Sequence, residues 1–145
     1  MLGALAISVQ SIHRRRGVAR RMVSAVADLA RARGYRCVVA PARPSAKARH
    51  PWVPMEDYLG WTDSVGRVYD PWLRSHVAAG GRLVGVCSRS MVVDEPVAFW
   101  EVWARQRFEH SGDYLLPGGL VPLRVDLETG RGRYVEPGVW VVYDL

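Results

Sequence analysis

Cysteine is scarce in this sequence, and no cluster of metal ligands accompanies it. The two cysteines, Cys37 and Cys87, stand alone, outside any CxxC pair and outside any Cys/His group with the spacing of a metal site. This pattern argues against a disulfide framework and against structural zinc. It predicts a protein of the reducing cytoplasm.

Long hydrophobic runs are also missing. No apolar run approaches the roughly 18 residues that a membrane-spanning helix needs. The opening MLGALAISV is followed rather than preceded by its positive charges, and no small-residue cleavage site comes before Arg14, which is the wrong order for a signal peptide. With 145 residues, 49% of them hydrophobic and 23% charged, the composition is that of one folded domain. We therefore expect no membrane partner.

Acidic residues are almost absent from the first third of the chain. Asp28 is the single acidic residue among residues 1–49, whereas arginines crowd His13–Arg49. The net charge of +6 predicts attraction to polyanions such as nucleotides, phosphorylated cofactors or RNA. The N-terminal third is therefore expected to form the surface that faces an anion.

Hydrophobic periodicity in that third predicts a strand, a helix and a second strand. The short apolar run Leu2–Val9 is typical of a buried strand, and Tyr35–Ala40, rich in β-branched residues, is a second one. Between them, Gly17–Arg33 is expected to be a helix that ends at Gly34. One face of this helix carries the apolar positions Val18, Met22, Val26 and Leu29. Such βαβ units are right-handed with parallel strands, so we predict the α/β (α+β) class.

The remainder of the chain predicts further helices and an antiparallel strand pair. Pro41–Pro54, with four prolines, is expected to be an irregular loop. The expected helices and strands are, in turn, Met55–Trp61, Asp70–Ala79 and Glu95–Phe108, and Arg82–Val86, Ser90–Val93, Tyr114–Asp126 and Tyr134–Asp144. In the second of these helices Asp70 is the expected N-cap and Pro71 the first helical residue. The last two strands are expected to pair through the turn-rich LETGRGR.

The stretch HRRRGVARRM, His13–Met22, lies between the first predicted strand and the predicted helix. At a helix N-terminus the backbone N–H groups are unpaired and the helix dipole is positive, so backbone amides can hold a phosphate there. Gly17 at the helix entrance and the small Ala19 leave room for its close approach. Solvated arginines at an ordinary helix start are the alternative, which the residues alone leave open.

The sequence VQSIHRRRGVA, Val9–Ala19, resembles the acyl-CoA-binding signature of the GNAT N-acyltransferase superfamily, in which a valine and a short spacer precede Gln/Arg-x-x-Gly-x-Gly/Ala at the start of a helix. Arg14, Gly17 and Ala19 match its three defining positions. The resemblance implies that the pyrophosphate of coenzyme A rests on the amides of Arg15–Ala19, with pantetheine beside Ile7–Val9. The residues that it implies as binding acetyl-CoA, or another acyl-CoA, are Ile7, Ser8, Val9, Arg14, Arg15, Arg16, Gly17, Val18, Ala19 and Arg20.

The same resemblance suggests candidates for proton transfer. Members of the family often carry Tyr-x-x-x-Gly at the end of a later helix, with the tyrosine as general acid to the departing thiolate; here HVAAG places His76 at that position. A histidine can donate a proton near neutral pH, whereas a half-buried helix histidine with no catalytic role is the alternative. Tyr58 is a second candidate for the acid. Leu2–Val9 contains no acidic residue, so the glutamate base that many members carry on this strand has no counterpart.

The resemblance also predicts the domain organisation. It covers residues 2–93, which we interpret as the C-terminal half of a GNAT domain. Residues 94–145 resemble a C-terminal extension found on some members of the family and are expected to pack on the same sheet. A complete domain has further strands and helices before the strand assigned to Leu2–Val9, so the resemblance implies a truncated chain, or a partner chain or second copy that covers the exposed sheet.

The function implied by the resemblance is transfer of an acyl group, in the first place acetyl, from coenzyme A to the primary amine of a small molecule, in the cytoplasm and without a metal. One alternative is a tRNA- or RNA-binding aminoacyl transferase on the same scaffold, and another is a degenerate member without catalysis. Nucleic acid is not favoured, because no RNA-recognition motif is visible and coenzyme A phosphates already account for the arginines.

Overall fold

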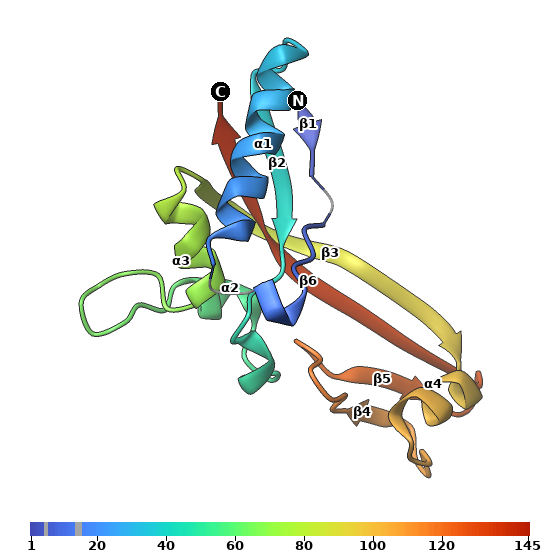
Figure 1. Cartoon of the computed structure of the whole chain (residues 1–145). Coiled ribbons are helices and arrows are strands. Elements are labelled where there is room, and N and C mark those ends of the chain that lie inside the picture. Colours follow the sequence, from blue (N-terminus) through green and yellow to red (C-terminus); the bar gives the residue numbers. More distant parts are fainter. Residues whose placement is uncertain (5, 14–15) are drawn as a thin grey trace.

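The structure is a computed structural model that describes residues 1–4, 6–13 and 16–145. Within these residues, six strands form one sheet in the order β1-β2-β6-β5-β4, and β3 pairs with the other edge of β6 (Figure 1). The strands are β1 (Leu2–Gly3), β2 (Cys37–Ala42), β3 (Arg82–Pro96), β4 (Gly112–Tyr114), β5 (Leu123–Asp126) and β6 (Arg131–Asp144). The helices are α1 (Val18–Ala32), α2 (Met55–Leu59), α3 (Pro71–Ala78) and α4 (Val97–Ala104), with short 3-10 turns at Ser11–His13 and Lys47–Arg49.

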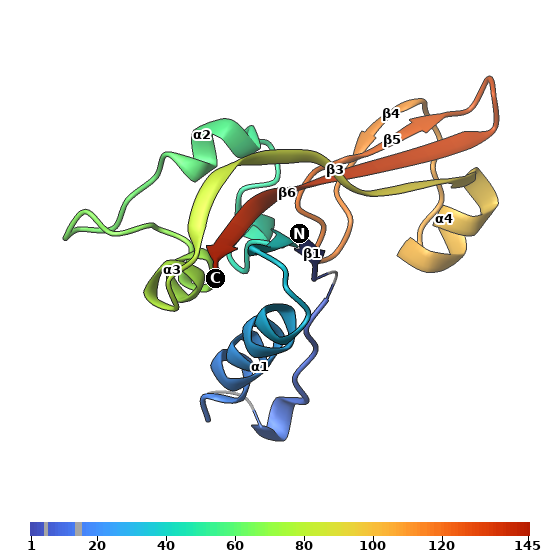
Figure 2. The same cartoon turned by 90° about the horizontal axis from the view of Figure 1, so that it is seen from above.

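The long strand β6 joins the two ends of the molecule. It runs antiparallel to β3 from Arg131 to Val142, and on its other edge it pairs first with β5 and then, from Val139 to Asp144, with β2. Figure 2 shows β3 and β6 running together from the end that holds α1 and α3 to the end that holds α4, β4 and β5. The sheet is therefore continuous, with a separate hydrophobic core at each end.

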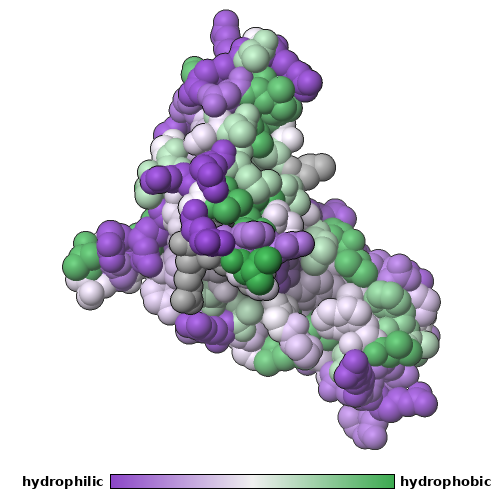
Figure 3. Space-filling view, in the orientation of Figure 1, coloured by the Kyte–Doolittle hydropathy of each residue, from purple (hydrophilic) through white to green (hydrophobic). Residues whose placement is uncertain are grey.

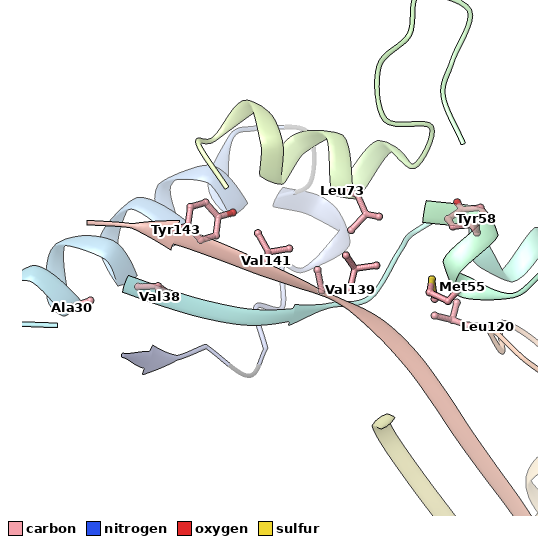
Figure 4. Close-up of a cluster of buried hydrophobic side chains, with 10 residues drawn as sticks. Ala30, Val38, Met55, Tyr58, Leu73, Leu120, Val139, Val141 and Tyr143 are labelled. Atoms are coloured by element: carbon pink, nitrogen blue, oxygen red, sulfur yellow. The ribbon is translucent and has the colours of Figure 1, made fainter. Parts of the chain in front are cut away.

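The first core forms where β6 meets β2, α2 and α3. Alternate residues of β6, Val139, Val141 and Tyr143, point to the buried side, as the twofold periodicity of a strand requires (Figure 4). Val38 of β2 and Leu73 of α3 belong to the same core. The second core forms at the far end from Trp100, Phe108, Leu116, Leu123, Val125 and Tyr134.

Several local predictions are confirmed. β1 and β2, which precede and follow α1 in the sequence, pair as parallel strands. Gly34 follows α1 and has a φ of +73°. Asp70 is the N-cap of α3, where its carboxylate accepts hydrogen bonds from the backbone N–H groups of Trp72 and Leu73, and Pro71 is the first helical residue. These features depend on residues close together in the chain, which is why the sequence predicts them.

The prediction of a buried strand over Leu2–Val9 is wrong beyond Gly3. Backbone pairing with β2 reaches only the N–H of Ala4, which donates to the Val39 carbonyl at 2.8 Å. The predicted apolar face of α1 is also wrong in part. Met22 and Leu29 are exposed, and the residues that pack on the core are Val23, Val26 and the fully buried Ala30. Small Ala30 allows the helix to approach the sheet closely, so the buried face is turned by one residue.

Other element boundaries shift for identifiable reasons. Arg82–Val86 and Ser90–Val93 are not separate strands but parts of β3, which has an irregular register between Cys87 and Met91. The helix expected over Glu95–Phe108 is shorter: Pro96, which has no N–H to donate, is its N-cap, and Arg105 with φ of +54° ends it. The strand expected over Tyr114–Asp126 is split into β4 and β5 by the intervening sequence LLPGGLVP. The boundary expected after Val93 falls inside β3.

Candidate active site

A groove of about 1050 Å³ runs between the start of α1, the segment Ile7–Val9 and the helix α3. We call it the large groove. Its floor is completed by Arg43–Ser45, just after β2, and by Tyr143 near the end of β6. Ile7, Ser8, Val9, Gly17, Val18, Ala19 and Arg20, predicted from the sequence as binding residues, all line it, and so does His76. Of the other predicted binding residues, Arg16 is exposed next to Gly17, while Arg14 and Arg15 lie outside the described residues.

The turn into α1 has the geometry of an anion site. Gly17 is the N-cap with φ of +72° and ψ of 7°, a left-handed conformation that glycine adopts without strain. Among the described residues no side chain caps the helix, and the N–H groups of Val18, Ala19 and Arg20 have no partner within it. A Cβ built on Gly17 meets no atom of the described residues within 4 Å. Open space therefore lies in front of unpaired amides, which fits a phosphate group.

Segment Ile7–Val9 lines the large groove because the chain does not follow β2. After Ala4 donates to the Val39 carbonyl, no further pairing with β2 occurs in the described residues. A continuous strand over Leu2–Val9 would have carried this segment along the sheet edge. The early end of β1 thus places Ile7–Val9 on one wall of the groove, opposite α3.

His76 on α3 lies in the opposite wall and is only 6% exposed. Its Nδ1 is 2.5 Å from the Tyr143 hydroxyl, and its ring packs edge-on against Trp72 with centroids 4.4 Å apart. Among the described residues, its Nε2 is the one buried side-chain nitrogen or oxygen without a hydrogen-bond partner. Burial lowers the pKa of His76 and raises the pKa of Tyr143, so both side chains are uncharged at neutral pH.

An uncharged pair of this kind can exist in two tautomers. If Nδ1–H donates to the Tyr143 oxygen, Nε2 carries a free lone pair and can accept a proton. If the Tyr143 hydroxyl donates to Nδ1, Nε2 carries a proton that it can donate. The sequence predicted His76 as a general acid. The lowered pKa means that the ring must first accept a proton before it can act as a strong acid.

The comparisons with known proteins point in one direction. Over its whole length the chain is 34% identical to the arginine N-acetyltransferase avaD of Aspergillus versicolor, and it spans 56% of that protein. It shares its fold with the loading GNATL domain of CurA from Lyngbya majuscula, with a TM-score of 0.57 and 20% identity over 98% of this chain and 53% of that one. The chain has a GNAT-like fold. No family model matches the sequence.

The chain thus spans about half the length of the two proteins described above. Both matches extend through residues 94–145, beyond the part in which the sequence resemblance was recognised. Within residues 1–4, 6–13 and 16–145, no group of three or more His, Cys, Asp or Glu side chains is placed to hold a metal ion. No helix of the same residues is long and apolar enough to cross a bilayer.

Tyr58, the second candidate for the acid, has a structural position. It is buried in the first core and does not line the large groove. Its hydroxyl donates to Asp70 Oδ2 at 2.8 Å, and burial together with this hydrogen bond raises the pKa of Tyr58. The geometry therefore favours His76 over Tyr58 for proton transfer.

Several residues of the site were not found from the sequence. Tyr143 was missed, although its alternation with Val139 and Val141 places the three on one face of a strand. Arg43 and Glu136 were also missed. Glu136 stands between the apolar Val135 and Pro137, which is the pattern of a buried carboxylate with a partner elsewhere. That partner is Arg43, whose Nε donates to Glu136 Oε1 at 2.7 Å.

Proposed function

We propose that this chain binds acyl-CoA in the large groove and transfers the acyl group, acetyl in the first place, to a primary amine. One observation carries the proposal. The left-handed turn at Gly17 and the nearby segment Ile7–Val9 line the same groove as the buried His76, which is far from both in the sequence. The match to an arginine N-acetyltransferase supports the same reaction class, and the match to a GNATL domain supports the fold.

In this proposal the amides at the start of α1 hold the phosphates. The free N–H groups of Val18, Ala19 and Arg20 point out of a positive helix end, and the exposed Arg16 and Arg20 add cationic side chains. Arg14 and Arg15 remain predicted contributors. The pantetheine arm follows Ile7–Val9 toward α3. Acyl-CoA supplies the thioester, and the protein contributes positioning and proton transfer.

The transfer step requires one proton to move from nitrogen to sulfur. The amine nitrogen attacks the thioester carbonyl, a C–N bond forms and the C–S bond breaks. His76 Nε2, uncharged at neutral pH, takes the proton that the amine nitrogen loses. The resulting imidazolium is hydrogen-bonded through Nδ1–H to Tyr143, and it returns the proton to the sulfur that leaves. His76 thus acts first as base and then as acid.

The amine acceptor is proposed from the relative. Because avaD is an arginine N-acetyltransferase, L-arginine is the first acceptor to test. A small, partly apolar cavity beside the large groove is available for an acceptor of about that size.

Calorimetric titration of acetyl-CoA into the purified chain tests the proposal. We expect saturable binding by the wild type and a loss of about a hundredfold or more in Gly17→Val, because the new side chain occupies the open space and strains the turn. Gly66→Val is the matched control: Gly66 has φ of +78° and open space around it, but it lies on the exposed loop before α3.

Gly66→Val should bind acetyl-CoA as the wild type does. Equal losses in the two variants would mean that strain, not the groove, governs binding. A wild type that fails to bind acetyl-CoA but binds tRNA with steep salt dependence would overturn the proposal in favour of an RNA-binding protein.

A further inference from the structure

A second cavity, of about 310 Å³, lies beside the large groove between α4, β3, β6 and the loop around Gly118. We call it the aromatic pocket. Phe99, Trp100, Trp103 and Tyr134 form much of its wall, and Arg43 and Glu136 are the charged residues that line it. Arg43 also lines the large groove, so this side chain stands between the two cavities.

The guanidinium of Arg43 is held in a fixed orientation by a buried carboxylate. Its Nε donates to Glu136 Oε1 at 2.7 Å, and its Nη2 donates to Glu136 Oε2 at 3.0 Å and to the Gly118 carbonyl at 2.7 Å. The Tyr134 hydroxyl also donates to Glu136 Oε2, at 2.5 Å, and itself accepts from the N–H of Leu120. Both oxygens of Glu136 are thus occupied by hydrogen bonds within the protein. The role of Glu136 is therefore to position Arg43 rather than to bind a cation from a ligand.

One side of the Arg43 fork remains available. Among the described residues, the Nη1 atom of Arg43 has no hydrogen-bond partner, and the side chain is 51% exposed. The N–H groups of Nη1 can therefore donate a charge-assisted hydrogen bond to a carboxylate oxygen. A ligand that carries only an amine would leave these donors unused.

The remainder of the aromatic pocket fits a flat side chain. Phe99 and Trp103 are large aromatic residues, yet they are 45% and 53% exposed to solvent. They flank the buried Trp100, with ring planes at 86° and 77° to it. Figure 3 shows hydrophobic surface at the end of the molecule where α4 lies. Open aromatic faces next to a guanidinium can take an aromatic ring or a planar cation by stacking.

We propose that the aromatic pocket is the acceptor subsite and that the acceptor is an α-amino acid. Its carboxylate pairs with Nη1 of Arg43, its flat side chain stacks against Phe99 and Trp103, and its α-amine faces the large groove. The subsite rests on the proposed acyl transfer for its role. The carboxylate and the flat side chain of the ligand are inferred from the pocket itself, and its primary amine from the proposed acyl transfer.

Two pairs of ligands test the contribution of the carboxylate, because the members of each pair differ only in that group. The flat part of the side chain is a guanidinium in one pair and a phenyl ring in the other. L-arginine is compared with agmatine, and L-phenylalanine with 2-phenylethylamine, by calorimetry on the full chain with and without saturating acetyl-CoA. In whichever pair binds, we expect the acid to bind at least about tenfold more tightly, because the charge-assisted pair with Arg43 is lost in the amine. Binding of the amine as tightly as the acid overturns the proposal, and so does absence of binding by both acids.

Single substitutions test which residues cause the preference for the acid over the amine. Arg43→Gln should reduce the ratio between acid and amine to about threefold or less. Arg43→Lys, which keeps the charge without the fork, should be intermediate. Trp103→Ala should weaken both members of a pair equally. Arg33→Gln is the matched control, because Arg33 is exposed at the opposite end of α1 from the large groove.

The results separate the two proposals. If acetyl-CoA fails to bind while the amino acid binds through Arg43, the subsite stands and the acyl transfer fails. If acetyl-CoA binds and Arg43→Gln weakens that binding without changing the ratio between acid and amine, Arg43 serves the phosphates and the subsite is wrong. The wild-type ligand pairs decide the question even if Arg43→Gln does not fold, since that variant leaves Glu136 buried without its cation.

Discussion

His76 and Tyr143 lie 67 residues apart in the sequence, and their side chains meet in the wall of the large groove with Nδ1 and the hydroxyl oxygen 2.5 Å apart. Burial affects the two in opposite directions, lowering the pKa of the imidazole and raising that of the phenol. The result is an uncharged hydrogen-bonded pair with an unpartnered Nε2, the arrangement that a proton carrier between an amine and a thiolate requires.

Replacement of His76 is expected to slow the transfer itself. In His76→Gln, kcat should fall by about a hundredfold or more, with acetyl-CoA affinity unchanged, because the proton carrier is lost. Tyr143→Phe should cost only about fivefold, the value of one hydrogen bond to the ring. Steady-state kinetics with L-arginine measure both. His110→Gln, at an exposed loop histidine, is the control. A larger loss in Tyr143→Phe than in His76→Gln would assign the proton transfer to the tyrosine.

The pH dependence of kcat/KM should follow the ionisation of His76. Burial lowers its pKa below the ordinary value of 6.5, and the reaction needs the unprotonated Nε2. Activity is therefore expected to stay level as the pH falls through 6.5 and to decline only below the lowered pKa. Rate profiles of the wild type and His76→Gln check this, since the variant should lose the acidic limb. An acidic limb retained in the variant would belong to another group.

Asp70 is expected to be the most important single carboxylate for stability. Its oxygens accept hydrogen bonds from the backbone N–H groups of Ser45, Ala46, Trp72 and Leu73 and from the hydroxyls of Ser45 and Tyr58. Asp70→Ala removes a helix cap and leaves buried donors unpaired, which should cost about 3 kcal/mol or more. Urea unfolding measures the loss. Asp28→Ala, at an exposed position, should change stability by less than about 0.5 kcal/mol.

The same carboxylate predicts an acid-labile contribution to stability. Burial alone would raise the pKa of Asp70, but the hydrogen bonds from Ala46, Tyr58, Leu73 and Ser45 outweigh it and bring the pKa below the ordinary 3.8. The contribution is present above 3.8, the value in the unfolded chain, and is lost as the pH falls through the folded-state pKa. The wild type should therefore lose more stability than Asp70→Ala over that interval. Equal losses in urea titrations at neutral and acidic pH would contradict this.

Any side chain at position 132, where the protein has Gly132, is expected to lower the stability of the folded protein. A Cβ there would lie 2.7 Å from Nε1 of Trp100 and in steric overlap with its Cδ1, and that same indole N–H donates to the Gly132 carbonyl at 2.8 Å. Gly132→Ala should cost about 1–3 kcal/mol through displacement of Trp100. Thermal unfolding and near-ultraviolet circular dichroism measure the effect. Gly3→Ala, in another strand with open space around it, is the control and should be close to neutral. Equal effects would place the cost in the backbone rather than in the contact with Trp100.

The sequence by itself determined the features that depend on neighbouring residues. The turn at Gly17, the helix after it and the cap formed by Asp70 and Pro71 depend on local backbone preferences, so they could be predicted without the fold. The spacing of His76 from Gly80 likewise marked the histidine through its resemblance to a family pattern. Parallel pairing of β1 and β2 followed from the strand–helix–strand order.

Only the tertiary structure decided which distant groups meet. Periodicity shows that a segment is apolar but not where its pairing stops, so the end of β1 after Gly3 and the opening of the large groove could not be predicted. Arg43 and Glu136 are 93 residues apart, and Tyr143 reaches His76 through the register of β6 against β2 and β3. Such contacts depend on long-range strand register, which local sequence does not encode, and they define both cavities of the proposed site.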